Sequence, residues 1–271
     1  MLYFGLILSG LIAGTWGSLI GAGGGFILVP LLLFVFPDAK PATVTAISLV
    51  AVLTTGISAT VAYIRLKRID FKLGIILGLA SIPTAILGVM AVVSLSRTAF
   101  QAIFAGLLIV LAAYLIFIRR KYMNNPERAP RGSTPCELTD KSGTTYKYKA
   151  NFKLGGAITL FTGFLSAMLG IGGGLLNVPA LIFILQIPVH VATATSQLAL
   201  AATSGTAVTT HAIRGTLLSG EWIYALLCGV GTVVGAQIGP RISGRLSGVW
   251  IVRFLALGLA ALGARLLWNV F

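Results

Sequence analysis

The chain has 271 residues, of which 57% are hydrophobic and 10% are charged, and its mean hydropathy is +0.97. A soluble protein of this size needs a charged surface that this composition cannot supply, so a soluble globular fold is excluded. The net charge of +14 would suit a nucleic-acid partner, but the basic residues lie in short connecting segments and one linker, without interleaved aromatic residues. That distribution is typical of the loops that orient a membrane protein, so we expect the lipid bilayer as a partner and no nucleic acid.

Apolar segments follow one another through the first half of the chain. Runs of about 18 or more apolar residues predict helices that cross a bilayer. The first run has no basic region before it and predicts a membrane helix rather than a cleaved signal peptide. The second is too short to cross a hydrocarbon core of ~30 Å as a straight helix. The segments lie near residues 2–20, 26–36, 42–64, 73–94 and 99–118.

A polar segment from residue 119 to residue 149 follows, rich in Lys, Arg, Asn, Pro, Thr and Ser. It has too few apolar residues to bury a core, so we predict a loop between two halves rather than a domain. Its basic residues place it in the cytoplasm. The predicted units are a first transmembrane repeat (1–118), a cytoplasmic linker (119–149) and a second transmembrane repeat (150–271).

The second half repeats the pattern of the first, with apolar segments near 152–169, 175–187, 190–212, 221–240 and 249–270. GAGGGFILVP at 21–30 aligns with GIGGGLLNVP at 170–179, and TAIS at 45–48 aligns with TATS at 193–196. An internal repeat of about 148 residues is too long for a solenoid unit and fits a duplicated membrane bundle. We therefore predict an all-α polytopic membrane protein with two repeats of about five membrane segments each.

The relative direction of the two repeats depends on how often each half crosses the membrane. Five crossings per half would invert the second repeat and put both termini outside. Four crossings and a re-entrant piece would put both termini inside. The two arrangements place nearly the same number of basic residues on the inner side, but Arg241, Arg245 and Arg253, which have no acidic neighbour, face the cytoplasm only in the first. We therefore expect inverted repeats.

A run of glycines interrupts an apolar stretch in each half, at Gly23, Gly24 and Gly25 and again at Gly172, Gly173 and Gly174. Interrupted backbone at membrane depth is tolerated only where protein or a watery cavity satisfies its polar groups, and glycine permits the turn. We interpret each run as the start of a half-helix whose unpaired N–H groups and positive dipole end favour an anion. Two such starts would converge on one anion near the midplane.

Close helix packing is the alternative explanation for glycines in membrane helices. It suits glycines that are four residues apart better than a run of three. Such pairs are Gly74 and Gly78, Gly231 and Gly235, and Gly235 and Gly239.

Polar side chains inside the apolar segments are hydroxyls and amides, and no Asp or Glu lies in the middle of a segment. A cation or metal site, or a carboxylate proton relay, would need such acids, so a neutral or anionic substrate is favoured and no metal, cofactor or catalytic residue is expected. His211 is a candidate coupling group or an interfacial histidine, and Cys136 and Cys228 share no motif spacing. Together with the glycine runs, the candidate substrate-binding residues are Thr45, Ser48, Asn177, Thr195, Ser196 and Gln197.

The duplicated G-x-G-G-G followed by an apolar stretch and Pro resembles the sulfite exporter TauE/SafE family of anion permeases. The PVHVATATSQ segment at 188–197, with its weaker counterpart PATVTAIS at 41–48, carries the same resemblance. The resemblance implies a multi-pass protein of a prokaryotic plasma membrane that transports small sulfur-containing or organic anions such as sulfite, sulfoacetate or thiosulfate, usually outward. Relatives that take up thiosulfate rely on cysteines in the pathway, for which Cys228 is the one candidate here.

We therefore expect a membrane transporter, with export of such an anion by alternating access between the repeats. An anion channel and an uptake permease for thiosulfate or sulfonates are the alternatives, and an enzyme is not expected. The identity of the anion, the direction of transport, the coupling ion and the formation of a homo-oligomer stay open.

Overall fold

A computed structural model describes residues 2–122, 132–216 and 221–268. Within them the first half consists of α1 (Leu2–Ile20), α2 (Gly25–Val35), α3 (Pro41–Arg65), α4 (Phe71–Val93) and α5 (Arg97–Tyr122). The second half consists of α6 (Phe152–Leu169), α7 (Gly174–Pro179), α8 (Val189–Ile213), α9 (Trp222–Ser243) and α10 (Gly248–Trp268). These bounds agree with the ten apolar segments and confirm the helical membrane fold that the sequence predicts.

A break at each glycine run separates two neighbouring apolar segments. α1 ends at Ile20 and α2 begins at Gly25, and α6 ends at Leu169 and α7 begins at Gly174. After Pro179, which has no N–H to donate, the chain continues as the π-helix η1 (Ala180–Ile184). Four residues separate the two helices at each break, so the breaks lie at equivalent positions in the two halves, whereas the π-helix follows only the second.

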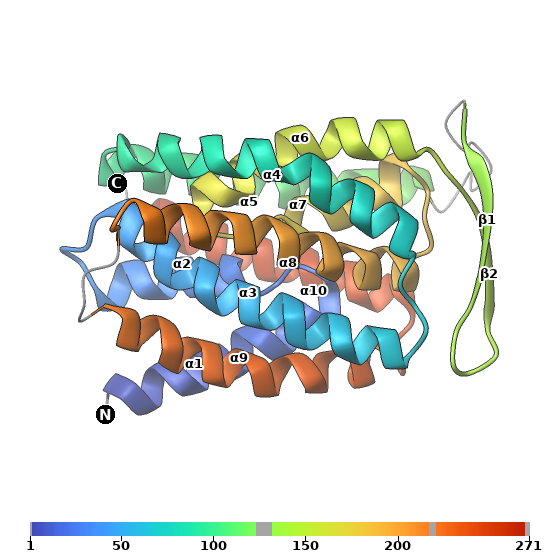
Figure 1. Cartoon of the computed structure of the whole chain (residues 1–271), viewed down its shortest axis with the longest axis horizontal. Coiled ribbons are helices and arrows are strands. Elements are labelled where there is room, and N and C mark those ends of the chain that lie inside the picture. Colours follow the sequence, from blue (N-terminus) through green and yellow to red (C-terminus); the bar gives the residue numbers. More distant parts are fainter. Residues whose placement is uncertain (1, 123–131, 217–220, 269–271) are drawn as a thin grey trace.

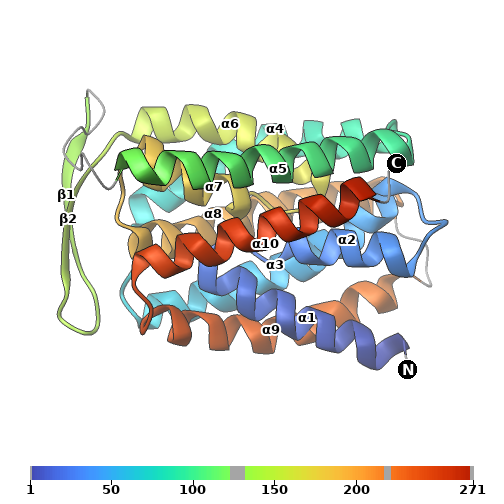
Figure 2. The same ribbon diagram turned by 180° about the vertical axis from the view of Figure 1, so that it is seen from behind.

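The chain turns back at each interruption. α1 starts at the end of the bundle that carries both chain termini, and α2 returns to that end (Figures 1 and 2). α6 starts at the opposite end, and α7 returns there (Figure 1). The longest helices of the two halves are α3, α4 and α5 and α8, α9 and α10. How often each half crosses the membrane stays a prediction, because α1 and α6 are also long and apolar enough to cross.

Glycine lets the first helix of each half pack closely on the fourth helix of the other half. α1 packs along α9, and α6 packs along α4. A Cβ at Gly231 or Gly235 of α9 would collide with the carbonyl oxygen of Ile7 or of Leu11 in α1. Gly88 of α4 is as close to the Phe164 carbonyl of α6. Small residues bring helix backbones together in membranes, so the packing explanation holds for these glycines.

The outer surface is suited to lipid. Phe4, Phe161 and Leu257 are 72%, 67% and 67% exposed. Within the described residues, six helices are long and apolar enough to cross a membrane. The long helix α8, which is not among these six, is rich in Thr and Ser, and most of its polar side chains are buried. Polar residues therefore face the inside of the bundle and apolar residues the outside.

The linker forms a β-hairpin rather than the expected loop. β1 (Thr134–Thr139) pairs antiparallel with β2 (Thr145–Ala150), and Gly143 adopts a φ of 85° in the connecting turn. Alternating Thr, Tyr and Lys in TYKYKA suits a strand with one buried face. The hairpin has no core of its own and is held against the ends of the helices (Figure 1). Residues 123–131 of the predicted linker lie outside the described residues.

Candidate functional site

The two glycine turns meet inside the bundle and are held by a pair of equivalent hydrogen bonds. The hydroxyl of Ser48 in α3 donates to the carbonyl oxygen of Gly170 at 2.8 Å. The hydroxyl of Ser196 in α8 donates to the carbonyl oxygen of Gly21 at 2.9 Å. Each serine thus secures the turn that belongs to the other half of the chain.

Glycine is required at these turns for two reasons. The first is backbone conformation, since φ is positive at Gly21, Gly23, Gly24, Gly170, Gly172 and Gly173. The second is space at the next residue of each run. A Cβ at Gly25 would lie 2.6 Å from the Gly170 carbonyl oxygen, and a Cβ at Gly174 would collide with the Gly21 carbonyl oxygen. The turns therefore contact each other directly.

Backbone amides at the start of each half-helix are buried without an acceptor. In α2 the first amides to bond within the helix are those of Ile27 and Leu28, which donate to Gly24. In α7 they are those of Leu176 and Asn177, which donate to Gly173. The amides of the three residues before each of these pairs have no acceptor among the described residues. They belong to Gly24, Gly25 and Phe26 and to Gly173, Gly174 and Leu175. Unpaired N–H groups at a helix start favour an anion.

Most of the predicted polar side chains are occupied by structural hydrogen bonds. Thr45 donates to the Ala42 carbonyl of its own helix at 2.9 Å. Thr195 accepts a hydrogen bond from the amide of Asp70 at 3.0 Å. The side-chain amide of Gln197 donates to the Gly17 carbonyl at 3.2 Å, directly before the first turn. Gln197 and the two serines therefore secure the turns and the helix before the first turn, whereas Thr45 and Thr195 are occupied elsewhere.

Asn177 differs from the other predicted residues because its donor is free. Its Oδ1 accepts a hydrogen bond from Thr162 at 2.6 Å, while its Nδ2 has no partner within the described part of the chain. The side chain is 2% exposed. A Cβ placed at Gly173 would be 3.5 Å from Asn177 Nδ2 and 3.4 Å from Thr203 Oγ1. A free amide donor is thus buried beside the unpaired backbone amides of the second turn.

Further hydroxyls come together near Asn177, and two of them, Ser81 and Thr162, were not considered from the sequence. Thr203 donates to Ser81 Oγ at 2.7 Å. Ser81 and Thr162 come from α4 and α6, where single hydroxyls look like ordinary back-bonded residues of a membrane helix. Only the packing of α4 and α6 around α7 and α8 brings them to Asn177.

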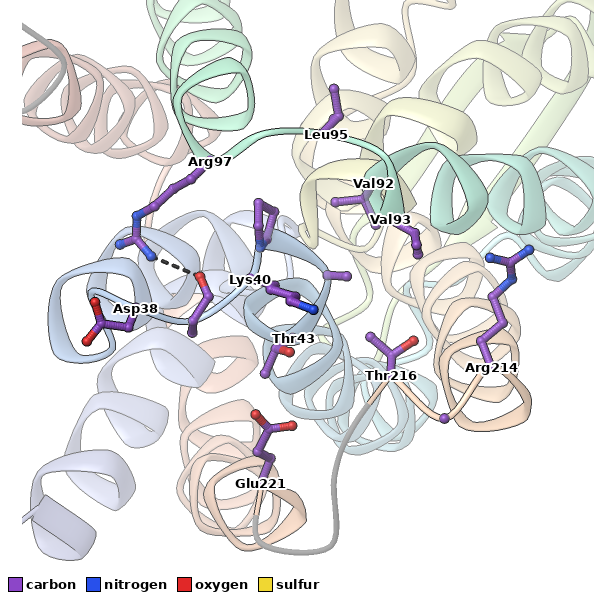
Figure 3. Close-up of a pocket in the computed structure, with 14 residues that line it drawn as sticks. Asp38, Lys40, Thr43, Val92, Val93, Leu95, Arg97, Arg214, Thr216 and Glu221 are labelled. Atoms are coloured by element: carbon purple, nitrogen blue, oxygen red, sulfur yellow. Dashed lines mark hydrogen bonds between the residues drawn. The ribbon is translucent and has the colours of Figure 1, made fainter.

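A cavity of about 760 Å³ opens at the end of the bundle that carries the termini (Figure 3). It lies between the start of α3, the ends of α4 and α8, and the segments beside them. Basic Lys40 and Arg214 line it together with acidic Asp38 and Glu221. Arg97 donates to the carbonyls of Leu33, Phe36 and Ala39 and so caps the end of α2. We call this cavity the vestibule. From the sequence, its basic side chains were considered only as charges that orient the protein in the membrane.

The family model of the sulfite exporter TauE/SafE matches residues 6–266. The chain belongs to this family. It is 33% identical over 270 residues to the probable membrane transporter protein YunE of Bacillus subtilis, covering 97% of both chains. It is 28% identical over 239 residues to a probable membrane transporter protein of Xylella fastidiosa, covering 88% of this chain and 84% of the relative. No solved structure matches the chain.

This TauE/SafE chain is therefore a membrane transporter, and it has one more buried polar residue of note. His211 in α8 is 1% exposed, and neither ring nitrogen has a partner in the described structure. The equivalent residue of the first half, about 148 positions earlier, is Tyr63, whose hydroxyl donates to the Ser18 carbonyl at 2.9 Å. The burial of the His211 ring does not decide between a coupling role and an interfacial position, and a coupling role for His211 stays a prediction.

Proposed function

We propose that this protein exports a small oxyanion, such as sulfite or sulfoacetate, from a prokaryotic cell across its plasma membrane. Two inverted repeats would alternate in exposing a site at the glycine turns. The substrate class follows the family description and the donors at the turns, and the relatives come from bacteria and an archaeon. The protein would act as a secondary carrier with no bound cofactor.

The course of the helices supports inversion of the repeats. α1 and α6 begin at opposite ends of the bundle (Figure 1). The contacts between halves are also exchanged in pairs, since α1 packs on α9 while α6 packs on α4, and α3 packs on α9 while α4 packs on α8. Such an exchange is expected of two related units that are joined by a pseudo-two-fold axis in the membrane plane.

The observation that carries the proposal is the set of unpaired amides at the two half-helix starts. Unsatisfied N–H groups in a membrane interior are costly, so a protein keeps them only where water or a ligand can satisfy them, and an anion satisfies several such donors at once. Asn177 Nδ2 adds a side-chain donor at the second turn. The site contains donors without a full positive charge, which can replace the hydration of an oxyanion and still release it.

The charge distribution supports the direction of the molecule in the membrane. The linker hairpin, the α3–α4 and α9–α10 connections and the adjoining ends of α3, α4, α5, α6 and α9 lie at one end of the bundle. Together they contain most of the basic residues, which favours a cytoplasmic position for that end. The vestibule then faces outward. Its lining has three basic residues, Lys40, Arg97 and Arg214, against the acids Asp38 and Glu221, and this small excess of positive charge would attract an anion to the outer mouth or assist its departure.

Transport assays in proteoliposomes test the proposal. Purified protein should catalyse sulfite uptake that saturates and is accelerated by sulfite on the opposite side. Acceleration of this kind is characteristic of a carrier, whereas a channel would give flux without it. Absence of sulfite and sulfoacetate flux, with the folded protein verified in the vesicles, would refute the function.

A substitution at Asn177 tests the site itself. Asn177→Leu installs the residue that stands at the equivalent place in the first half, Leu28, and removes the free donor. We expect at least a tenfold loss of sulfite affinity, because a lost hydrogen bond to a charged group costs about 1.5–3 kcal/mol. Thr209→Val is the control, since Thr209 is exposed and donates only to the Gly205 carbonyl of its own helix. Equal affinity of the two variants would exclude Asn177 from the site.

A further inference from the structure

The end of the bundle opposite the vestibule is closed by the β-hairpin, and a buried arginine lies beneath the hairpin turn. Arg68, from the α3–α4 connection, is 7% exposed. Its Nε and Nη2 donate to Asp140 Oδ2 at 3.1 and 2.9 Å. Its Nη1 is buried and has no acceptor in the described chain. A buried guanidinium with an unused donor is a strong binding group for an oxyanion.

Other buried polar atoms without partners lie around this guanidinium. A Cβ at Gly244 would lie 3.4 Å from Arg68 Nη1, so the end of α9 is in contact with the arginine. The preceding residue, Ser243, is fully buried, and its hydroxyl has no partner in the described structure. His190, at the start of α8, lies beside Tyr146 with a ring-centroid distance of 6.3 Å, and its Nδ1 is also unpaired. α3, α8 and α9 thus meet around Arg68.

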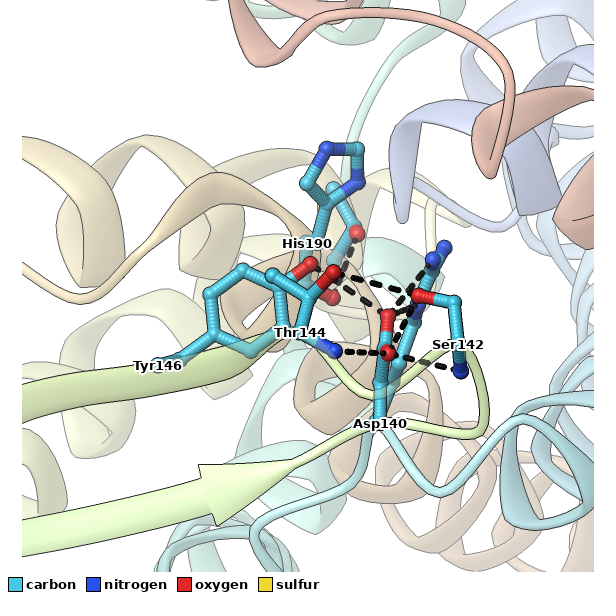
Figure 4. A network of polar contacts seen from close by, with 7 residues as sticks. Asp140, Ser142, Thr144, Tyr146 and His190 are labelled. Atoms are coloured by element: carbon cyan, nitrogen blue, oxygen red, sulfur yellow. Dashed lines mark hydrogen bonds and ion pairs between the residues drawn. The ribbon is translucent and has the colours of Figure 1, made fainter.

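Asp140 reaches Arg68 from the hairpin rather than from the helical bundle (Figure 4). Within the turn, the amides of Ser142 and Thr144 donate to Asp140 Oδ1 at 2.9 and 3.1 Å, and the Ser142 hydroxyl donates to the same oxygen. The turn therefore satisfies one carboxylate oxygen and presents the other to Arg68. Asp140 is the one acidic partner of Arg68 among the described residues.

We propose that Arg68, through its free Nη1, is a second oxyanion site at the cytoplasmic end, and that the Asp140 carboxylate occupies it when no substrate is bound. This inference rests on the proposed anion transport. Its ligand is the same class of small sulfonate, sulfite or carboxylate. The hairpin is then a tethered competitor, since an anion arriving at Arg68 displaces Asp140.

Displacement of Asp140 would also open this end of the bundle. Besides Asp140, the hairpin packs Leu138, Tyr146 and Tyr148 against the core. It also makes two hydrogen bonds to the helix ends: the Lys141 amide donates to the Leu66 carbonyl at 3.0 Å, and the Tyr148 hydroxyl donates to Asp70 Oδ2 at 2.8 Å. Both partners belong to the α3–α4 connection of the first half, while His190 beside Tyr146 belongs to the second half. The hairpin therefore bridges the two halves while Asp140 is bound, and exchange of Asp140 for substrate releases it.

The test is equilibrium binding of sulfite to the full-length protein in detergent, at constant ionic strength. Asp140→Asn removes the competing charge with little change in shape. We expect its sulfite Kd to fall about tenfold below that of the wild type, since apparent affinity scales with the fraction of sites that are free. Glu137→Gln is the matched control because Glu137 is an exposed acid on the same hairpin that contacts only Lys147, at 3.8 Å. The gain should vanish when Arg68→Gln is added to Asp140→Asn.

Alkylation of Cys136 gives a second readout of the hairpin in a Cys228→Ala background. Burial, and to a lesser degree the negative charge of Asp70, raises the pKa of the Cys136 thiol in the docked hairpin. Sulfoacetate, which does not add to maleimides as sulfite does, should speed the reaction of Cys136 with N-ethylmaleimide in the wild type, and Asp140→Asn should react fast without added anion. Size-exclusion profiles verify that each variant is folded.

The outcomes separate the inference from the proposed function. Equal sulfite affinity of wild type and Asp140→Asn, with binding abolished by Asn177→Leu, overturns the Arg68 site and leaves the transport site intact. A gain of affinity that persists in the Arg68→Gln double variant also overturns it. Absence of sulfite binding and flux in every variant refutes the proposed function, and the inference falls with it.

Discussion

Contact between the two glycine turns makes Gly25→Ala a sharp test of the structure. Gly25 is the first residue of α2, so its backbone is helical and alanine meets no conformational penalty there. The obstacle is space. The added Cβ would lie 2.6 Å from the Gly170 carbonyl oxygen, 2.8 Å from Ile171 Cα and 2.9 Å from Val52 Cγ2. Real Cβ atoms do not tolerate such distances, so one turn must move.

The two closest obstacles are backbone atoms of a turn that cannot yield easily. The Gly170 carbonyl is held by Ser48, and Gly170 itself has a φ of 75°. Overpacking of this kind costs about 1–3 kcal/mol, and we expect a value near the upper limit because backbone rather than a flexible side chain must shift. The gain in helix propensity from alanine is at most about 1 kcal/mol and smaller at a helix start. The net expected destabilisation is therefore about 2 kcal/mol.

Thermal unfolding in detergent, followed by circular dichroism, measures this effect. A loss of about 2 kcal/mol lowers Tm by roughly 5 °C in a chain of this size. Gly106→Ala is the matched control, because Gly106 lies within α5 and nothing approaches its Cβ position within 4 Å. This variant should be as stable as the wild type or slightly more stable. If Gly25→Ala unfolded at the same temperature as Gly106→Ala, the turns would not be in contact and the reasoning would fail.

Two further predictions concern polar contacts. Ser196→Ala removes the hydrogen bond to the Gly21 carbonyl and leaves that oxygen buried, so unfolding should be easier by about 1–2 kcal/mol; Ser94→Ala, at an exposed helix end, should have no measurable effect in the same melt. The second concerns pH. Burial alone would raise the pKa of Asp140, but hydrogen bonds from Ser142, Arg68 and the amides of Thr144 and Ser142 outweigh it and lower the pKa to about 2, from an ordinary 3.8. A lowered carboxylate pKa stabilises the folded state above the ordinary value, and this stabilisation, on the order of 2 kcal/mol, is lost as pH falls from about 4 towards 2. The stability difference between wild type and Asp140→Asn should thus be constant from pH 5 to pH 8 and shrink below about pH 4; a change between pH 5 and pH 8 would contradict the assignment.

Local patterns in the sequence predicted the helices and the breaks between them. Hydropathy placed the apolar segments because a bilayer imposes a length and an apolar surface on any helix that spans it. The duplicated glycine runs predicted the turns because few other residues adopt a positive φ. The choice of Asn177 and Gln197 as binding candidates also came from the sequence, since a side-chain amide is costly to bury in a membrane.

Other features depend on partners that are far apart along the chain. Ser48 and Gln197 were selected as substrate donors, yet Ser48 bonds to Gly170 and Gln197 to Gly17. The linker was expected to be a loop because it cannot form a core, but contacts with Leu66, Arg68 and Asp70 at the helix ends support a hairpin. No local pattern contains those pairings.

The amino-acid sequence by itself determined the class of the protein, the family to which it belongs, the repeat and the positions at which helices break, since each depends on the chemistry of neighbouring residues. The tertiary structure alone decided that the broken helices turn back, that the two turns secure each other and that a hairpin carboxylate meets Arg68. Those features result from long-range packing and hydrogen bonding, where the energy of a polar group depends on which distant segment lies against it.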